Sequence, residues 1–431
     1  MNFEEFNLDP RLLEGIRRLG YTAPTPIQEK TIPAALAGED IIGTAQTGTG
    51  KTVAFVLPIL ERLLKGPRRR ARTLIVTPTR ELAEQINDVF RDLATGTGLR
   101  SVTLYGGVGA APQVRALRDG TEILVACPGR LLDHLSQGVA HLDGIEVLVL
   151  DEADRMLDMG FLPDIKRILA KLPSHRQTML FSATFPQEIE QLAARTLHDP
   201  KRIAIGISRP AYTVAHALYP VPQHLKTPLL LELLRKTDTG SVLVFTRTKH
   251  RAERLSKQVA HAGFRATSLH GDRTQGQRQT ALNGFKSGHF QVMVATDIAA
   301  RGLDVEGISH VINFDMPATA DDYIHRIGRT GRAEHNGDAF TLVTPDDRDM
   351  IRALEKIIGS ALPQRKLDGF DYSQPAPAPS TQVRPPRVKP ASAGAERHTQ
   401  PAHRPGQGPS RPGNPRRKNG SPRSRPGPAE R

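Results

Sequence analysis

The sequence contains a single cysteine, Cys127, among its 431 residues, and this excludes an internal disulfide framework. A chain with so little cysteine fits a reducing compartment. The first residues, Met-Asn-Phe-Glu-Glu-Phe, are acidic where a secretory signal would be basic and then apolar. No stretch approaches the about 18 apolar residues that a membrane helix needs. We therefore expect a soluble, cytoplasmic protein without a membrane partner.

Acidic residues are fewer than basic ones, and the net charge is +14. Much of this excess lies in residues 371–431, where 12 Lys/Arg residues accompany only three Asp/Glu residues. Pro, Arg, Gly, Ser and Gln dominate this segment, which has almost no aliphatic side chains to bury. We expect it to be a disordered basic tail. Such a tail can tether RNA, can target ribosomal or degradation partners, or can simply add solubility.

Two blocks of the chain, 31–205 and 223–370, alternate short β-rich runs with helical patterns. This alternation is typical of an α/β fold in which a parallel sheet carries helices on both faces. Residues 1–30 precede the first block, and residues 206–222 are expected to be a linker. Predicted strands fall at 73–77, 101–104, 122–125, 146–150 and 177–181, and then at 242–245, 291–294, 310–314 and 339–343. The sequence therefore predicts two similar domains followed by a tail.

An octet that begins at Ala45 indicates a phosphate-binding loop between a short apolar strand and a helix. Small residues let backbone N–H groups approach phosphate oxygens, and the helix N-terminus adds partial positive charge. The Lys51 ammonium can reach the β- and γ-phosphates, and the Thr52 hydroxyl can bind Mg²⁺. The usual pattern begins with glycine, so a chance match in a glycine-rich loop is the alternative. The predicted ligands of ATP here are Ala45, Gln46, Thr47, Gly48, Thr49, Gly50, Lys51 and Thr52.

Two adjacent carboxylates, Asp151 and Glu152, follow the apolar run 147–150. In a phosphate-loop ATPase the first acid holds Mg²⁺, and the second orients or deprotonates the attacking water. A solvated acidic turn is the alternative for an isolated pair, but the loop upstream favours the ATPase interpretation.

A glycine-spaced segment of the second block carries Arg326, Arg329 and Arg332. Arginines that reach a γ-phosphate from another domain act as arginine fingers, and a basic surface loop is the alternative. This division of the machinery between two blocks suggests that hydrolysis requires domain closure.

The order and spacing of these motifs over about residues 1–365 resemble a DEAD-box RNA helicase of superfamily two. Asp151-Glu-Ala-Asp154 is the motif that names this family. The resemblance implies two tandem RecA-like domains that bind ATP and Mg²⁺ and close on one RNA strand. It also implies ATP-dependent unwinding of short duplexes or remodelling of RNA–protein complexes. The compact core with a basic tail resembles the bacterial RhlE-type branch.

The same resemblance assigns roles to individual residues. Gln28 would read adenine, and Phe3 and Tyr21 would form its pocket. The further nucleotide contacts would be Gly302 and Asp304, the latter at the ribose. Hydrolysis would be coupled to unwinding by Ser182 and Thr184 bonded to Asp154, and by His325, which links to the acidic motif. The implied RNA-backbone contacts are Pro78, Thr79, Arg80, Gly107, Pro128, Gly129, Arg130, Arg247, Gly271 and Thr296.

Two details of the pattern keep other interpretations in view. Ser182 and Thr184 could simply cap a helix. Cys127 stands where the family usually has threonine, which puts one phosphate contact in doubt.

Three other functions compete with the helicase interpretation. A DNA translocase of the same superfamily would respond to DNA, and the adenine-reading segment argues against it. A passive RNA-binding scaffold with a vestigial ATP site would not need intact Lys51, Glu152 and Arg329. A dinucleotide-binding oxidoreductase would need a Gly-x-Gly-x-x-Gly motif after its first strand, and none is well placed there.

Overall fold

The computed structural model describes residues 2–44, 49–204, 214–237, 240–300, 305, 307–330 and 337–376. Predictions that lie outside the described residues concern Ala45, Gln46, Thr47, Gly48, Gly302, Asp304, Arg332, part of the expected linker and most of the tail. Among the described helices, none is both long and apolar enough to cross a bilayer.

The first domain contains a seven-stranded sheet in the order β3-β4-β2-β5-β6-β1-β7, and all of its pairings are parallel. The strands are β1 (Ile41–Thr44), β2 (Thr73–Val76), β3 (Ser101–Leu104), β4 (Ile123–Ala126), β5 (Val147–Leu150), β6 (Gln177–Ser182) and β7 (Lys201–Ala204). The helices are α1 (Pro10–Arg18), α2 (Pro26–Leu36), α3 (Lys51–Leu63), α4 (Arg80–Leu93), α5 (Ala111–Arg118), α6 (Pro128–Ser136), α7 (Ala153–Asp158), α8 (Leu162–Leu169) and α9 (Gln187–Thr196). A short 3₁₀ turn, Phe3–Phe6, precedes α1.

Five strands of this sheet contribute side chains to two hydrophobic cores, because successive side chains point to opposite faces: β1, β2, β4, β5 and β6. In β5, Val147 and Val149 pack with α1 to α4, whereas Leu148 and Leu150 pack against the helices of the other face. Strands covered on both faces read as continuous apolar runs, which is why five of them were predictable from the sequence.

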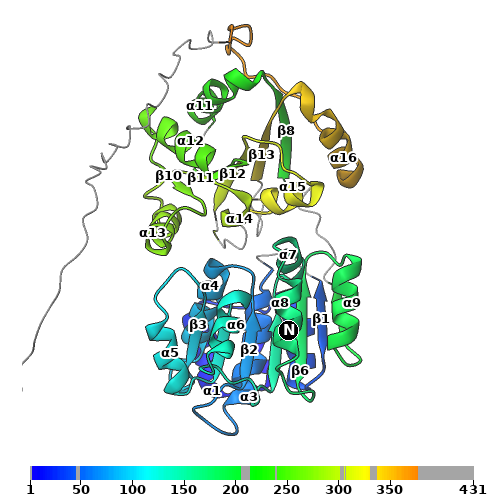
Figure 1. Cartoon of the computed structure of the whole chain (residues 1–431). Helices are drawn as coiled ribbons and strands as arrows, with labels where there is room; N and C mark the ends of the chain where they lie inside the picture. Colours follow the sequence, from blue (N-terminus) through cyan, green and yellow to red (C-terminus); the bar gives the residue numbers. More distant parts are fainter. Residues whose placement is uncertain are drawn as a thin grey trace, which may run out of the picture. The chain divides into compact units, whose positions relative to one another are not determined.

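The second domain repeats this plan with a six-stranded parallel sheet in the order β10-β11-β9-β12-β13-β8 (Figure 1). The strands are β8 (Val214–Pro220), β9 (Ser241–Phe245), β10 (Ala266–Leu269), β11 (Val292–Ala295), β12 (Ile308–Asn313) and β13 (Gly337–Val343). The helices are α11 (Lys226–Lys236), α12 (Lys249–His261), α13 (Gln275–Lys286), α14 (Asp297–Ala300), α15 (Ala320–Ile327) and α16 (Arg348–Ile358). The prediction of two parallel-sheet domains is therefore confirmed.

The expected linker 206–222 is wrong for its second half, because residues 214–220 form strand β8 and pair with β13 along its whole length. His216 interrupts the apolar pattern of this edge strand, so the sequence signal is weak. Strands β7 and β10 were also not predicted. In β7 the exposed Lys201 and Arg202 hide the strand pattern.

The expected tail also begins later than residue 371. Phe370 and Tyr372 pack against the second-domain core, with their ring centroids 4.9 Å apart. The Tyr372 hydroxyl accepts a hydrogen bond from the Leu367 amide at 2.9 Å. These two aromatic side chains make the apolar contacts that attach this segment to the domain, and the Pro- and Arg-rich sequence that follows has few side chains of this kind.

Candidate active site

The sequence-predicted residues of the first domain lie at the carboxyl edge of its sheet. Strands β1, β2, β4, β5 and β6 lead directly into the segments that contain Lys51, Thr79, Pro128, Asp151 and Ser182. Ligands of open α/β sheets bind outside the carboxyl ends of the strands. Topology thus gathers motifs that are separated by up to 130 residues.

Gln28 forms hydrogen bonds with the end of the phosphate-loop segment and with Thr25 before it. The Gln28 amide donates to the Gly50 carbonyl at 3.1 Å and accepts from the Thr25 amide at 2.9 Å. The Thr25 hydroxyl donates to the Thr49 carbonyl at 2.9 Å. Gly50 has φ +92°, and a Cβ there would lie 2.6 Å from the Gln28 amide nitrogen. Lys51 follows as the first residue of α3 and is 6% exposed.

Phe3 and Tyr21, the two predicted pocket aromatics, lie beside each other with ring centroids 6.5 Å apart. Phe3 is buried, whereas Tyr21 is 38% exposed and so keeps a face available for stacking. The structure brings these rings together at the segment that also contains Gln28.

The acid pair after β5 is almost completely buried. Asp151 and Glu152 are each 3% exposed, and the Glu152 amide donates to Asp151 Oδ1 at 3.0 Å. Glu152 adopts a left-handed conformation, φ 53°, which costs a non-glycine residue about 1–3 kcal/mol. Neither carboxylate oxygen of Glu152 has a hydrogen-bond partner among the described residues, and the nearest cation is Arg155 Nε at 3.4 Å.

These properties fit a site for Mg²⁺ and water. Burial raises the pKa of Asp151 to about 6, although the charge of Lys51 opposes the rise. Burial disfavours the charged carboxylate, and a cation beside it would stabilise that charge. No cluster of three or more His, Cys, Asp or Glu side chains suited to a metal occurs within the described ranges. Mg²⁺ is usually held by one or two carboxylates together with waters and substrate phosphates, and Asp151 offers one such carboxylate.

The predicted bonding between Asp154 and the Ser182-Ala-Thr184 segment is confirmed. Asp154 Oδ2 accepts hydrogen bonds from the Ala183 amide at 3.1 Å, the Thr184 amide at 2.9 Å and the Thr184 hydroxyl at 3.1 Å. The Asp154 amide donates to Ser182 Oγ at 3.1 Å. Burial disfavours the charge of Asp154, but the Thr184 hydrogen bond and nearby cations outweigh it and lower the pKa. The capping alternative fails, because α9 begins at Gln187 after Pro186.

The predicted RNA-contact residues of the first domain converge at the ends of β2, β3 and β4. Gly107 has φ +81°, and a Cβ there would lie 2.1 Å from the Arg80 guanidinium. The Arg130 guanidinium donates to the Val108 carbonyl at 3.4 Å and to Gln113 Oε1 at 3.2 Å. Glycine at position 107 therefore leaves room for the Arg80 guanidinium next to the loop that Arg130 contacts.

The remaining first-domain predictions are at the starts of two helices. The Thr79 hydroxyl accepts from the Leu82 amide and caps α4, after Pro78. Pro128 and Gly129 form the first turn of α6 after Cys127. Burial raises the pKa of the Cys127 thiol to about 12, so this side chain is a neutral thiol at physiological pH.

The second-domain predictions occupy equivalent positions. Arg247, Gly271 and Thr296 follow β9, β10 and β11 at the carboxyl edge of that sheet. Arg247 is exposed, and its amide donates to Asp315 Oδ2 at 2.9 Å.

Sequence reasoning missed one contact between the domains. The Arg278 guanidinium donates to Glu81 Oε1 at 2.7 Å. The Gln275 amide donates to the same oxygen at 3.3 Å. Nothing local in the sequence pairs these residues with Glu81, which lies 194 positions before Gln275.

His325 is partly buried and Arg329 is buried in the glycine-spaced arginine segment. Burial and the charge of Arg155 lower the pKa of His325 to about 4, against the influence of Asp154. The imidazole is therefore neutral at physiological pH. Arg329 is 3% exposed.

Arg326 is not an arginine finger. Its guanidinium forms two hydrogen bonds with the Asp297 carboxylate, at 2.5 and 2.7 Å, and lies over the Phe245 ring. It also donates to Asn313 Oδ1 at 3.0 Å and to the Asp315 carbonyl at 2.8 Å. Its hydrogen-bonding capacity is used inside the second domain, so this side chain holds the strand ends together.

We expect Arg326→Gln to lower the free energy of unfolding by about 3–5 kcal/mol, because it removes one partner of a buried ion pair. Chemical denaturation followed by circular dichroism measures the change. Arg352→Gln, an exposed arginine of α16 with only an i,i+3 partner at 3.6 Å, is the matched control and is expected to change stability by about 0.5 kcal/mol or less. Equal stabilities of the two variants would contradict this structural role.

Two parallel sheets, with a lysine-bearing loop after β1 and a buried acid pair after β5, define a nucleotide hydrolase built from two RecA-like domains. Comparisons with known proteins agree. The family model for the DEAD/DEAH box helicase matches residues 25–192, and that for the helicase conserved C-terminal domain matches residues 225–334.

Relatives of the chain come from plants and bacteria. DEAD-box ATP-dependent RNA helicase 30 of Arabidopsis thaliana is 45% identical over 366 residues, which is 83% of this chain and 62% of that protein. The ATP-dependent RNA helicase CshA of Limosilactobacillus reuteri is 44% identical over 83% of this chain and 72% of its own length. RhpA of Helicobacter pylori is 43% identical over 86% of this chain and 76% of its own length.

Solved structures show the same domain pair. Dbp5 of S. cerevisiae bound to RNA and ADP BeF3 aligns with a TM-score of 0.74 and 29% identity, over 85% of this chain and 95% of that one. A DEAD box protein of Methanococcus jannaschii aligns with a TM-score of 0.51 and 37% identity, over 85% and 99% of the two chains. The chain belongs to the DEAD-box ATP-dependent RNA helicases, a family that couples RNA-stimulated ATP hydrolysis to RNA unwinding.

Proposed function

We propose that this chain hydrolyses ATP between its two domains and uses the closed state to bend one RNA strand away from its complement. The observation that carries the proposal is the buried acid pair. Glu152, whose carboxylate oxygens have no hydrogen-bond partner among the described residues, is adjacent to Asp151 and two residues from Asp154, which bonds Thr184. The short segment 151–154 thus contains Glu152, which is suited to activate water, and Asp154, whose bonds to Thr184 are suited to couple hydrolysis to unwinding.

The nucleotide roles follow from this placement. The loop of residues 45–50 would cradle the phosphates, Lys51 would neutralise them, and Thr52 with Asp151 would hold Mg²⁺. When bound, Mg²⁺ would supply positive charge that offsets the negative charge of the phosphates. Glu152 would orient the attacking water and accept its proton.

Base recognition and charge stabilisation complete the nucleotide site. Gln28 would bond adenine, with Phe3 and Tyr21 beside it, and Gly302 and Asp304 would meet the ribose side. Arg329 and Arg332 would stabilise the charge that develops on the transferring phosphate. His325 would connect these arginines to Asp154.

The RNA roles rest on the residues at the carboxyl edges of both sheets. Arg80, Gly107 and Arg130 from the first domain, with Arg247 and Thr296 from the second, would contact the sugar–phosphate backbone of one strand. The other proposed contacts are Pro78, Thr79, Pro128, Gly129 and Gly271. Contacts to phosphates and 2′-hydroxyls carry little sequence information, so binding would be largely indifferent to base sequence.

Domain closure would link the two sites. ATP and RNA each contact both domains in the closed state, so together they would shift the population toward it. The helix α6, which begins at Pro128, would force a bend that a duplex cannot follow. Hydrolysis and phosphate release would then reopen the cleft and free the RNA.

Finer assignments belong to the same proposal. A compact core followed by a basic tail supports assignment to the RhlE-type branch. The same tail would contact ribosomal or degradation machinery. We also propose a cytoplasmic location. The relatives described above carry other names, CshA and RhpA, so the branch rests on composition.

ATP turnover measured alone, with RNA, and with DNA of the same sequence tests the proposed function. RNA should stimulate turnover and DNA should not, and a short RNA duplex should separate only when ATP is present. Equal stimulation by DNA would favour the translocase, and turnover that ignores nucleic acid would contradict the proposal.

Ser182→Ala combined with Thr184→Ala should abolish strand separation and leave RNA-stimulated ATP turnover largely intact. The reason is that the Asp154 carboxylate would lose the hydrogen bond from the Thr184 hydroxyl, and the Asp154 amide would lose its bond to the Ser182 hydroxyl. The side chains of Asp151 and Glu152 would be unchanged. Unwinding and turnover are measured on the same preparation. Thr95→Ala with Ser136→Ala, two exposed hydroxyls of the same domain, is the control. A parallel loss of both activities would refute a coupling role.

A further inference from the structure

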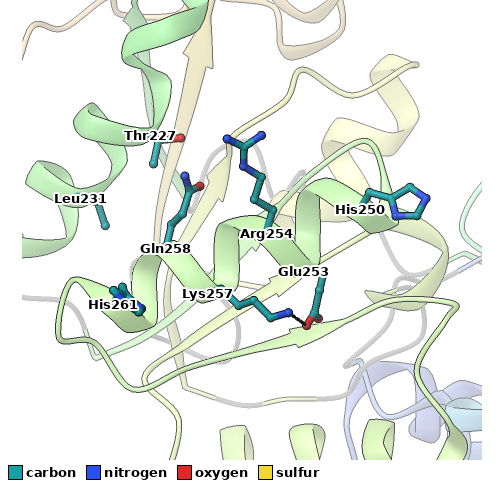
Figure 2. A pocket seen from close by; sticks show the side chains of 8 residues that line it. All are labelled: Thr227, Leu231, His250, Glu253, Arg254, Lys257, Gln258 and His261. Atoms are coloured by element: carbon teal, nitrogen blue, oxygen red, sulfur yellow. Dashed lines mark ion pairs between the residues drawn. The ribbon is translucent and has the colours of Figure 1, made fainter. Parts of the chain in front are cut away.

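A groove of about 650 Å³ lies between α11 and α12 of the second domain, apart from the residues discussed above (Figure 2). Thr227 and Leu231 contribute the α11 wall. The α12 wall consists of His250, Glu253, Arg254, Lys257, Gln258 and His261.

The polar face of α12 is a basic stripe. His250, Arg254, Lys257 and His261 recur at spacings of four, three and four residues, so they share one side of the helix. Ala252, Leu255 and Val259 form the opposite side and are buried in the domain core. With a rise of about 1.5 Å per residue, the stripe extends for roughly 16 Å.

Among the lining residues, one is acidic, and its carboxylate is already bonded to partners within the domain. Glu253 accepts hydrogen bonds from Ser268 Oγ at 2.7 Å, His270 Nε2 at 3.1 Å and Arg273 at 3.2 Å. Lys257 Nζ lies 3.0 Å from its other oxygen (Figure 2). The hydrogen bonds from Ser268 and His270 lower the pKa of Glu253, so its charge is stably held.

Arg254 has no such partner. Among the described residues it makes no ion pair and no side-chain hydrogen bond, and Figure 2 shows its side chain extending separately from the Lys257–Glu253 pair. The groove therefore presents uncompensated positive charge, which complements a polyanion.

Two features next to the groove are suited to RNA. Arg247, a proposed RNA contact, precedes His250 by three residues at the start of α12. On the α11 side, His224 Nε2 lies 2.8 Å from the Gln374 carbonyl, and the Lys236 ammonium donates to the Asp368 carbonyl. These contacts hold the segment that leads into the basic tail along α11.

We propose that the α11–α12 groove is a second phosphate-binding track, which holds the backbone of the RNA strand where it extends beyond the core site. Arg254 and Lys257 would pair with phosphate oxygens, and Gln258 and Thr227 would meet phosphates or 2′-hydroxyls. The proposal rests on the proposed placement of RNA at Arg247. Continuity with that edge favours RNA over an acidic peptide, which is the other polyanion the groove could accept.

Binding of two oligouridine strands to the full chain tests this track. The short strand is the shortest that stimulates ATP turnover fully, and the long strand is twice that length. Arg254→Gln with Lys257→Gln should weaken binding of the long strand about tenfold at low salt and reduce the slope of log affinity against log salt by about 1.4. Affinity for the short strand and its stimulation of turnover should be unchanged.

Arg352→Gln with Lys356→Gln is the matched control, because it removes two exposed cations of the same domain, one of them in a helical ion pair. Identical RNA binding by the two double variants would overturn the proposal. An equal loss of affinity for the short and the long strand in Arg254→Gln with Lys257→Gln would also overturn it. Preferential loss of polyglutamate binding would assign the groove to acidic peptides instead. Failure of the unaltered chain to bind the short strand would contradict the proposed function rather than the track.

A crosslink gives an independent measurement. In the Gln258→Cys variant the new thiol is the only reactive one, since burial raises the pKa of Cys127 to about 12. A photoreactive group attached there should crosslink to the long strand and not to the short one. Crosslinking to neither strand would overturn the proposal.

Discussion

The variant Glu152→Gln should hydrolyse ATP about 10²–10⁴-fold more slowly than the unaltered chain, while it binds ATP and RNA normally. Glutamine has nearly the same shape but cannot accept a proton from water. The two carboxylate oxygens of Glu152 are buried without a hydrogen-bond partner among the described residues, so the substitution removes no hydrogen bond, although it replaces the charge that faces Arg155 Nε at 3.4 Å by a neutral amide. Single-turnover hydrolysis at saturating RNA measures the chemical step.

Binding of a fluorescent nucleotide and of RNA, measured separately, shows whether the loss is confined to chemistry. The control is Glu188→Gln, which removes the charge of an exposed glutamate in α9 of the same domain. That variant should turn over ATP at the normal rate. Normal turnover by Glu152→Gln, or a loss of ATP binding that accounts for its slow rate, would contradict the assignment of Glu152 as the base.

The variant Arg329→Ala should lower the rate of RNA-stimulated hydrolysis by about 10³–10⁵-fold, the range of effects seen for arginine fingers. The guanidinium stabilises charge that exists mainly in the transition state, so ATP affinity should fall much less than the rate. Arg329→Lys should recover only part of the rate, because an ammonium cannot form the paired hydrogen bonds of a guanidinium.

Arg326 supplies the contrast for this experiment, since it is three residues away and has the same chemistry. Arg326→Gln should unfold at a lower denaturant concentration, whereas the main effect of Arg329→Ala should be on the rate of hydrolysis. If Arg329→Ala hydrolysed ATP at the normal rate with RNA, the finger assignment would be wrong.

Much of the site could be predicted because its residues follow apolar strands directly. The run Val147–Leu150 is recognisable from composition, and a parallel strand must deliver Asp151 and Glu152 to the carboxyl edge of its sheet. The same reasoning placed Lys51 after β1 and Ser182 at the carboxyl end of β6. In these cases the local sequence and the sheet topology require the same position.

Weak local patterns explain the errors in the domain boundaries. Strand β8 contains His216, and its pairing partner β13 lies more than 100 residues later, so only the completed sheet identifies it. Phe370 and Tyr372 belong to the second domain because that domain offers them a core to pack against.

By itself, the sequence determined the two-domain α/β plan, the phosphate-binding loop, the acidic motif and the arginine segment, because each depends on strand periodicity or on residues adjacent in the chain. Only the tertiary structure decided that the Arg326 guanidinium is bonded inside the second domain, that Arg278 pairs with Glu81, and that Arg254 makes no ion pair or side-chain hydrogen bond within the part of the chain that the structure describes. Side-chain charges are satisfied across space, and which carboxylate meets which guanidinium depends on strand order and helix packing rather than on distance along the chain.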